Sequence, residues 1–329
     1  MQLKNKKFID LFAGIGGFHQ ALDKFGAECV FASEWDKYAA ATYQENYGIE
    51  PFGDITLINE KDIPQHDILC AGFPCQAFSV SGKQKGFEDT RGTLFFVIAR
   101  IINHHKPQLI LLENVKNLVR HDKGNTFNVI KSTLDELGYD VYHKVLNASH
   151  FGLPQNRERV YIVGFRKDSN YSSFSFPEPN QIKTCLNDIL EKNPTGAKVI
   201  NRPDIQIRKE YEPEIVDSEI VLPNKPIQIG IVNKGGQGER IYHPLGHSIT
   251  LSAYGGGVGS KTGLYKINDE IRKLSPRECA RLQGFPESFK ICSSPSQAYK
   301  QFGNSVAINV LVAIFEQISN MSRERKNDA

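Results

Sequence analysis

The sequence contains a cysteine directly after a proline, in the stretch CAGFPCQAFS that runs from Cys70 to Ser79. This residue, Cys75, follows the apolar run HDILCAG, which is typical of a buried strand. A cysteine thiol is partly ionised at neutral pH and intrinsically nucleophilic, so it can attack an electrophile without a dedicated base. Cys70 lies inside the apolar run and suits burial as a small apolar side chain. We therefore interpret Cys75 as a nucleophile.

Two other kinds of cysteine site fit this stretch less well. A zinc deaminase needs an H-x-E motif upstream and a C-x-x-C motif, and no second cysteine follows Cys75 at that spacing. No metal site is therefore expected. A Cys/His hydrolase remains an alternative, because His66, His143 or His150 could reach Cys75 in the folded chain.

An acid and two arginines complement the thiol. Glu113 and Asn114 end the apolar run LLENV, at the sheet edge where Cys75 is expected. A carboxyl in a water-poor cleft favours its acidic form, so it can donate a hydrogen bond or a proton to a ring nitrogen. Arg157 and Arg159 in QNRERVY are two apart, hence on one side of a strand, and could hold a carbonyl oxygen. The alternative for this pair is a solvated strand end.

Thiol, acid and arginine together suit the activation of a cytosine ring. Carbon-5 of cytosine is a poor nucleophile. Thiolate addition at carbon-6, with N3 protonated by the acid and O2 held by arginine, would give an enamine whose carbon-5 can attack a methyl sulfonium. This chemistry requires a second pocket for the methyl donor.

Residues upstream predict such a pocket. The stretch DLFAGIGG places glycines at a strand-to-helix turn, where a ligand can approach the backbone closely. His19 stands where a dinucleotide fingerprint has its third glycine, so a ligand with adenosine but no phosphates fits better. Glu34 is placed to reach ribose hydroxyls. Trp35 could stack on a purine or anchor the core, and Asp54 could accept an exocyclic amine or be an ordinary turn residue.

The order of the apolar runs predicts the elements that position these residues. Strand-like runs alternate with helical ones, which argues for a parallel sheet covered on both faces. Two further runs flank a turn and read as an antiparallel pair at the sheet edge. The expected strands are 7–12, 27–34, 66–72 and 107–114, the helices 16–26, 38–48 and 93–105, and the edge pair 139–148 and 157–165.

The second half of the chain is organised differently. From about Lys167 to Leu222 it is polar and lacks clear periodicity, which indicates a domain boundary near 170–190. Segment 226–265 has short β runs rich in glycine, and 299–320 returns to helix, with an apolar face expected to dock on the first domain. The fold class is therefore α/β with a smaller, mostly β second domain.

Composition indicates a cytoplasmic protein with reduced thiols. The 329 residues include six scattered cysteines, and no secretory signal is visible. The most apolar stretches fall far short of the roughly 20 residues of a membrane span, so no membrane role is expected. Net charge is only +3, but Lys225–Lys273 holds seven Lys/Arg against three acidic residues. This segment could contact phosphates or be an ordinary solvated face.

These residues in this order resemble the DNA cytosine-5 methyltransferases. The resemblance covers almost the whole chain and looks especially close to the small bacterial GCGC-methylating type of restriction-modification systems. It is carried by DLFAGIGGF, EWD, GDI, GFPCQAFSVSGKQKGFEDTRGTLF, ENV, QNRER, RECARLQGFP and QFGNSV, together with KGGQGERIY and TLSAYGGG in the variable region.

The resemblance implies a Rossmann-like, S-adenosylmethionine-dependent methyltransferase domain with a glycine-rich target-recognition domain. By this similarity Cys75 is the nucleophile, Glu113 engages cytosine N3, and Arg157 with Arg159 contacts the base and positions the site. The implied cofactor-binding residues are Phe12, Gly14, Gly16, Glu34, Trp35, Asp54, Ile55, Pro74, Leu94, Asn304, Ser305 and Val306.

The resemblance also implies that the target cytosine is flipped out of double-stranded DNA. Gln237 and Ser81 would fill the gap that it leaves, and Arg240 would read a guanine. Lys83 and Lys85 would lie near phosphates on a mobile loop, and Tyr254 with Gly255, Gly256 and Gly257 would form a second recognition loop. The stretches HPLGH and VGSKTGLY depart from the GCGC type.

The implied domains are 1–186 for catalysis and cofactor binding, completed by 304–329, then 187–275 for target recognition and 276–303 as a hinge region. The enzyme would act as a monomer on DNA, alongside a restriction endonuclease that recognises the same site without forming a stable complex. Three rivals remain: a cytosine-5 methyltransferase acting on RNA, a DNA-binding protein that has lost catalysis, and a dehydrogenase.

Overall fold

The chain forms two compact units in a computed structural model. The structure describes residues 1–74, 94–169, 171, 174–180, 182–208, 210–216, 219–254 and 256–321. The first unit comprises Met1–Leu146, Glu158–Glu178 and Leu311–Ala329. The second comprises Asn147–Arg157 and Pro179–Val310.

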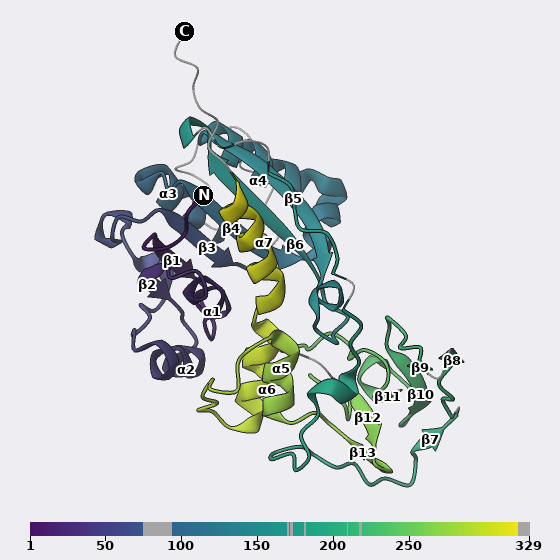
Figure 1. Cartoon of the computed structure of the whole chain (residues 1–329). Helices are drawn as coiled ribbons and strands as arrows, with labels where there is room; N and C mark the ends of the chain where they lie inside the picture. Colours follow the sequence, from purple (N-terminus) through teal and green to yellow (C-terminus); the bar gives the residue numbers. More distant parts are fainter. Residues whose placement is uncertain are drawn as a thin grey trace. The chain divides into compact units, whose positions relative to one another are not determined.

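A six-stranded sheet organises the first unit (Figure 1). Four neighbouring strands are parallel, and the next strand, β6, runs antiparallel to β4, so the expected parallel sheet is confirmed. The strand order is β2 (Glu28–Ser33), β1 (Lys7–Leu11), β3 (Ile68–Gly72), β4 (Leu109–Val115), β6 (Glu158–Arg166) and β5 (Tyr139–Asn147).

The core of this unit explains why the central strands are so apolar. The β3 and β4 strands are buried along nearly their whole length, as expected for strands covered on both faces. Their side chains pack with the apolar faces of α3 (Leu94–His105) and α4 (Asn125–Glu136) in one hydrophobic cluster. The α3 helix was expected from the sequence, whereas α4 was not among the predicted helices.

Caps determine where the other predicted helices begin and end. Asp36 caps α2 (Lys37–Tyr47) by accepting from the backbone N–H groups of Tyr38 and Ala39, and Gly48 ends it in the left-handed region, as expected. The α1 helix (Gly17–Asp23) stops earlier than predicted, and Gly26 lies beyond it in a turn with φ of 68°.

The C-terminal helical stretch is two helices, α6 (Pro295–Asn304) and α7 (Ile308–Asn320). From Leu311 onward α7 belongs to the first unit, where Phe315 packs against Phe25, so the expected return to the first domain is confirmed. Taken as one stretch, Pro295–Asn320 is long and apolar enough for a membrane span, but most of it is buried inside the protein, as in a core helix.

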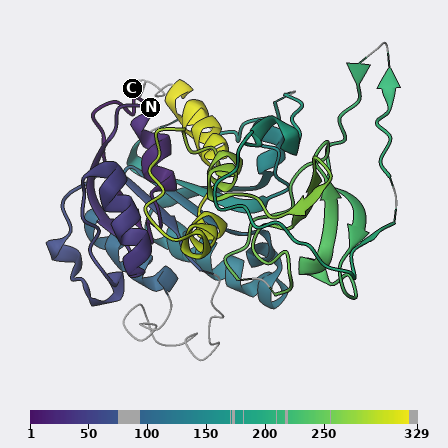
Figure 2. The same cartoon turned by 90° about the horizontal axis from the view of Figure 1, so that it is seen from below.

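A second sheet belongs to the second unit, whose strands are drawn in green in Figure 2. Its order is β13 (Glu270–Arg272), β12 (Leu264–Ile267), β11 (Arg240–His243), β10 (Ile227–Ile231) and β7 (Gln206–Ile207). A two-stranded ribbon, β8 (Ile215–Val216) with β9 (Glu219–Ile220), and the helices α5 (Pro276–Gln283) and α6 also belong to this unit. The short strands expected over 226–265 are confirmed.

Candidate active site

Candidate residues gather at one edge of the six-stranded sheet. The parallel strands β1 to β4 end there, and they lead to Phe12, Glu34, Pro74 and Glu113. The β6 strand begins at the same edge, because it runs antiparallel to β4, and its second residue is Arg159. The rule that ligands lie beyond the carboxyl ends of parallel strands therefore applies to these five positions.

The loop after β1, residues 12–17, has an unusual backbone that Glu34 fixes. Phe12, Gly14 and Gly16 all have positive φ, at 55°, 57° and 82°. One carboxylate oxygen of Glu34 accepts from the Gly14 N–H at 2.8 Å, and the other accepts from the Asp36 N–H at 2.8 Å. Burial raises the pKa of Glu34, and this effect outweighs the backbone hydrogen bonds, which lower the pKa. Glu34 therefore joins the glycine loop to the end of β2.

Two exposed aromatic side chains lie beside Glu34. Trp35 is 81% exposed, so the alternative that it anchors the core is wrong. Phe52 is also exposed and stacks on Phe31, and its carbonyl oxygen accepts from the Glu34 N–H at 2.7 Å. Sequence reasoning missed Phe52, because a lone aromatic residue in a loop carries no pattern.

The GDI stretch follows Phe52 and is held near the end of β2. Asp54 is exposed and caps a 3-10 turn (Ile55–Leu57) by accepting from the Thr56 N–H at 2.9 Å. Ile55 is buried in the core cluster of the first unit. Asp54 thus begins a turn as its N-terminal cap, which agrees with its alternative reading as a turn residue, and its exposure leaves it accessible to a ligand.

Glu113 and Arg159 form an ion pair across β4 and β6. Arg159 lies opposite Val115 in the register, and its Nε is 3.1 Å from Oε1 of Glu113. Both side chains are largely shielded from water, at 9% exposure for Glu113 and 15% for Arg159. The structure thus brings together the acid and one of the two arginines that the sequence singled out.

Asn114 performs a task that the sequence did not reveal. Its Nδ2 donates to the carbonyl oxygen of Phe73 at 2.8 Å, and its Oδ1 accepts from the Val115 N–H. Phe73 precedes Pro74 and Cys75, so this buried amide fixes the backbone that leads to the candidate nucleophile. Pro74 is exposed and Leu94 is half-buried. Cys75, Ser81, Lys83, Lys85 and Gly255 lie outside the described residues.

Arg157 is placed differently from Arg159. It precedes β6, belongs to the second unit and is buried. Its guanidinium donates to the carbonyl oxygens of Leu251, Gly303 and Ser305, at 3.2, 3.1 and 2.5 Å. Arg157 therefore holds carbonyl oxygens, as the sequence suggested, but these belong to the protein backbone.

The three residues expected to close the donor pocket follow Gly303 in the second unit. Asn304 is exposed, whereas Ser305 and Val306 are buried. A Cβ on Gly303 would lie 2.4 Å from the backbone of Ser252 and Ala253, so only glycine permits this approach. The segment is thus packed against the stretch that leads to Tyr254.

The two expected recognition loops pack against each other within the second unit. The Gly259 N–H donates to the Gly238 carbonyl at 2.7 Å, and a Cβ on Gly238 would lie 2.0 Å from the carbonyl oxygen of Gly256. Only a glycine at position 238 allows this contact. Candidate side chains stay accessible around it: Gln237, Arg240 and Tyr254 are exposed, as are Gly256 and Gly257, and Tyr254 is 78% exposed.

A polar network fixes the first of these loops. Asn233 donates to Oε1 of Glu239 at 2.7 Å, and Oε2 of Glu239 accepts from the Gly236 N–H at 3.0 Å. Arg202 donates to both Asp204 and Asn233. The loop conformation is therefore set by side chains before any ligand binds.

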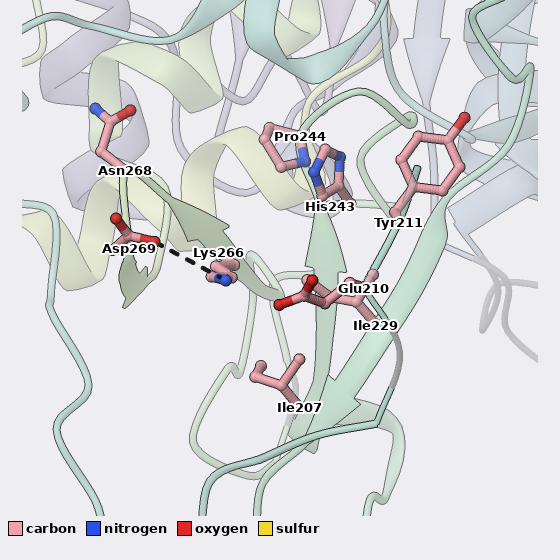
Figure 3. Close-up of a pocket in the computed structure, with 9 residues that line it drawn as sticks. All are labelled: Ile207, Glu210, Tyr211, Ile229, His243, Pro244, Lys266, Asn268 and Asp269. Carbon is pink, nitrogen blue, oxygen red and sulfur yellow. Dashed lines mark ion pairs between the residues drawn. The ribbon is translucent and has the colours of Figure 1, made fainter. Parts of the chain in front are cut away.

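A cavity of about 370 Å³ lies elsewhere in the second unit, on the β7–β10–β11–β12 sheet (Figure 3). Tyr211 and His243 contact each other at its wall, and burial lowers the pKa of His243. None of the candidate site residues lines it. Across the described ranges, no group of three or more His, Cys, Asp or Glu side chains could hold a metal ion.

Sequence comparisons with known proteins identify the family of this chain. A family profile described as C-5 cytosine-specific DNA methylase matches residues 6–320. The type II methyltransferase M.HhaI of Haemophilus parahaemolyticus is 55% identical over 97% of this chain and 96% of its own length. M.HpaII of Haemophilus parainfluenzae is 46% identical over 95% of this chain and 90% of its own length.

Solved structures agree on the fold. The S. pombe Dnmt2 methyltransferase has a TM-score of 0.68 and 21% identity over 96% of this chain and 98% of its own. A Spodoptera frugiperda DNMT2 variant has a TM-score of 0.69 and 18% identity over 95% and 99%. The resemblance seen in the sequence is confirmed, and the hydrolase, deaminase, dehydrogenase, RNA-modifying and non-catalytic alternatives lose their support. The chain belongs to the C-5 cytosine-specific DNA methylase family, whose enzymes transfer a methyl group from S-adenosylmethionine to carbon-5 of cytosine in DNA.

Proposed function

We propose that this DNA cytosine-5 methyltransferase modifies the cytosine of a GCGC-like duplex site through a covalent bond between Cys75 and carbon-6. The observation that supports this assignment most is the shielded Glu113–Arg159 pair at the carboxyl edge of the sheet. Asn114, next to Glu113 in the chain, holds the backbone that leads to Cys75. The carboxyl group of Glu113, the cation of Arg159 and the backbone that leads to the Cys75 thiol thus lie at one edge of the six-stranded sheet.

Each of these residues has a distinct task in the reaction. The Cys75 thiolate adds to carbon-6 of a flipped cytosine, which makes carbon-5 nucleophilic. Glu113 hydrogen-bonds to N3 of the cytosine, where charge changes during the addition. Arg159 keeps the Glu113 side chain oriented, and their ion pair places Arg159 close enough to contact the same cytosine. After methylation, loss of the carbon-5 proton expels the thiolate and restores the ring. Arg157, whose guanidinium is bound to backbone carbonyls, acts by positioning the polypeptide.

The donor pocket is formed around the glycine loop and Glu34. S-adenosylmethionine, when bound, supplies an electrophilic methyl group on a sulfonium. The loop backbone leaves room for close approach at Gly14, where a Cβ would meet no atom within 4 Å, and Gly16 allows the left-handed turn of the loop. Glu34 offers carboxylate oxygens to ribose hydroxyls, and the exposed face of Trp35 suits a purine. The remaining residues assigned to this pocket are Phe12, Asp54, Ile55, Pro74, Leu94, Asn304, Ser305 and Val306.

Replacing Glu34 with alanine should weaken donor binding roughly 10–100-fold, because a charged hydrogen-bond acceptor is worth about 1.5–3 kcal/mol. The change removes the acceptor for ribose and also releases the Gly14 and Asp36 N–H groups. Titration of S-adenosylmethionine in initial-rate assays at saturating DNA would measure the rise in KM.

Asp36→Ala is the matched control for Glu34→Ala. Asp36 lies two residues away and caps α2, so its loss should cost about 1 kcal/mol of stability and leave the donor KM unchanged. Equal donor KM values for wild type and Glu34→Ala would remove Glu34 from the pocket.

Sequence recognition is assigned to the interlocked loops of the second unit. Gln237 and Ser81 would fill the gap left by the flipped cytosine, Lys83 and Lys85 would contact phosphates, and Tyr254 to Gly257 would follow the backbone of the site. We keep 187–275 as the target-recognition domain, with 276–303 as the hinge region and 1–186 with 304–329 as the catalytic domain. The sequence resemblance to the small bacterial GCGC-methylating type supports the proposed site, and the 55% identity to the type II methyltransferase M.HhaI supports a type II modification role.

Replacing Arg240 with alanine should relax discrimination at one guanine by about 1–3 kcal/mol, because bidentate contact with O6 and N7 is lost. Arg240 begins β11 beside the fixed first loop, with its side chain exposed. Methylation rates on duplexes that carry 7-deazaguanine or adenine at each guanine would identify the position. Arg208→Ala, an exposed arginine on the same unit outside both loops, should keep the wild-type preference. An unchanged sequence preference in Arg240→Ala would mean that the recognition loop is wrongly assigned.

The biological setting follows from this assignment. We propose that the enzyme protects bacterial DNA in the cytoplasm as the modification partner of a type II restriction system. A cognate endonuclease would recognise the same site independently, and the methyltransferase would act as a monomer on DNA. Mapping methylated cytosines across a plasmid after incubation with S-adenosylmethionine tests the function as a whole. Methylation outside GCGC-like sites would overturn the specificity, and absence of methylcytosine would overturn the activity.

A further inference from the structure

A buried polar cluster lies directly behind the donor loop. It contains His19 of α1, Cys29 of β2, and Tyr43 and Tyr47, which lie one turn apart on α2. The Tyr43 hydroxyl is 2.7 Å from His19 Nδ1 and 3.5 Å from Cys29 Sγ. The Tyr47 ring stacks on the His19 ring, with centroids 4.0 Å apart and planes 13° from parallel.

Within this cluster, only the Tyr47 hydroxyl is hydrogen-bonded to the loop. It donates to the Gly16 carbonyl oxygen at 2.9 Å and lies 3.4 Å from the Ile15 carbonyl oxygen. The ring also touches Gly16 so closely that a Cβ there would lie 2.2 Å from Cε2 of Tyr47. Gly16 has a φ of 82°, a conformation that side chains disfavour. Tyr47 therefore fixes both the carbonyl direction and the left-handed turn.

The phenol of Tyr47 is suited to be a permanent donor. Burial raises its pKa well above the usual value, and the carboxylate of Asp10 raises it further, so the hydroxyl keeps its proton. Two residues earlier in the loop, Glu34 accepts from the Gly14 N–H. The loop is thus held at two points, two residues apart, by side chains from different elements.

His19 explains why the pattern of glycines departs from the dinucleotide fingerprint. A glycine at this position would leave no ring for Tyr47 to stack on. With His19 in place, α1 supplies one wall of the slot that holds Tyr47, and Tyr43 fixes the His19 ring from the other side. His19, which replaces the glycine that a dinucleotide site needs for close packing behind a pyrophosphate, is thus the residue that orients Tyr47.

We propose that Tyr47 is a positioning residue for the methyl donor, which sets the shape of the Phe12–Gly17 loop through its hydrogen bond to Gly16, with His19 and Tyr43 holding its ring. The inference rests on the proposed role of that loop in donor binding. Tyr47 does not touch the reacting atoms, so its effect belongs to donor affinity and not to the chemical step.

The test is the affinity of the DNA-free protein for S-adenosylhomocysteine, measured by calorimetry and by fluorescence of Trp35, the single tryptophan. Tyr47→Phe keeps the ring and removes only the hydroxyl. We expect binding to weaken about 3–10-fold, the value of one hydrogen bond, and the donor KM to rise by the same factor. The rate at saturating donor and the KM for DNA should stay unchanged.

Tyr139→Phe is the matched control, because it also removes a buried tyrosine hydroxyl that donates to a backbone carbonyl oxygen, that of Pro107 at 2.7 Å, but lies on β5 and outside the loop and its cluster. Both variants should lose similar stability in thermal unfolding, but only Tyr47→Phe should lose donor affinity. Unchanged affinity in Tyr47→Phe, or equal loss in both variants, would overturn the proposal. If wild type itself fails to bind, the donor pocket is misassigned; if only Glu34→Ala weakens binding, the pocket stands and Tyr47 has no part in it.

Discussion

Cys75→Ser should abolish methyl transfer and leave specific DNA binding largely intact. Only the attacking atom changes, and a serine hydroxyl is far less ionised than a thiol at neutral pH. Loss of a covalent nucleophile lowers turnover by roughly 10³-fold or more. Transfer of labelled methyl from S-adenosylmethionine into a GCGC duplex measures the loss, and a gel-shift titration on the same duplex measures binding.

Cys70→Ser provides the matched control. Cys70 lies in β3 only five positions earlier, fully buried, and burial raises the pKa of its thiol well above the usual value. Its thiolate is therefore suppressed, and turnover per folded molecule should be retained. A duplex with 5-fluorocytosine at the target should trap wild type and Cys70→Ser as covalent adducts, but not Cys75→Ser. Strong residual turnover in Cys75→Ser would exclude the thiol mechanism.

Much of the first unit could be predicted because it obeys short-range rules. Apolar runs of five to seven residues became β1, β3 and β4, and the helix over 38–48 ended at Gly48. The strand-end rule then placed Glu34 and Glu113 at one edge without any knowledge of their neighbours. The periodicity of apolar residues and the residues that cap helices are local properties of the sequence, so both can be recognised without knowledge of the fold.

The roles that could not be predicted depend on contacts between distant segments. Asn114 bonds to Phe73, 41 residues away, and Arg157 bonds to Ser305, 148 residues away. The two-residue spacing of Arg157 and Arg159 suggested a shared side of one strand, but β6 starts at Glu158, so the rule applies only to Arg159. The glycine at 238 looks like part of a flexible linker in the sequence, whereas it permits close packing of two loops.

Arg272→Met should destabilise the second unit by about 3–5 kcal/mol, because it leaves a buried carboxylate without its cation. Arg272 of β13 and Glu278 of α5 form a bidentate pair with two contacts of 2.8 Å, and both side chains are almost fully buried. Urea unfolding followed by far-UV circular dichroism measures the loss. Arg281→Met on the same helix breaks the Arg281–Glu287 surface pair and should cost about 1 kcal/mol or less.

The two halves of this pair should not be equivalent. Glu278 also accepts from the N–H groups of Ser275 and Glu191, at 2.8 and 3.0 Å, and so closes the N-terminus of α5. Glu278→Ala therefore leaves a buried guanidinium and two backbone donors without an acceptor, whereas Arg272→Met leaves a carboxylate that keeps both backbone bonds. We expect Glu278→Ala to be the more destabilising change. Equal losses would mean that the ion pair alone, and not its link to the helix cap, stabilises this part of the second unit.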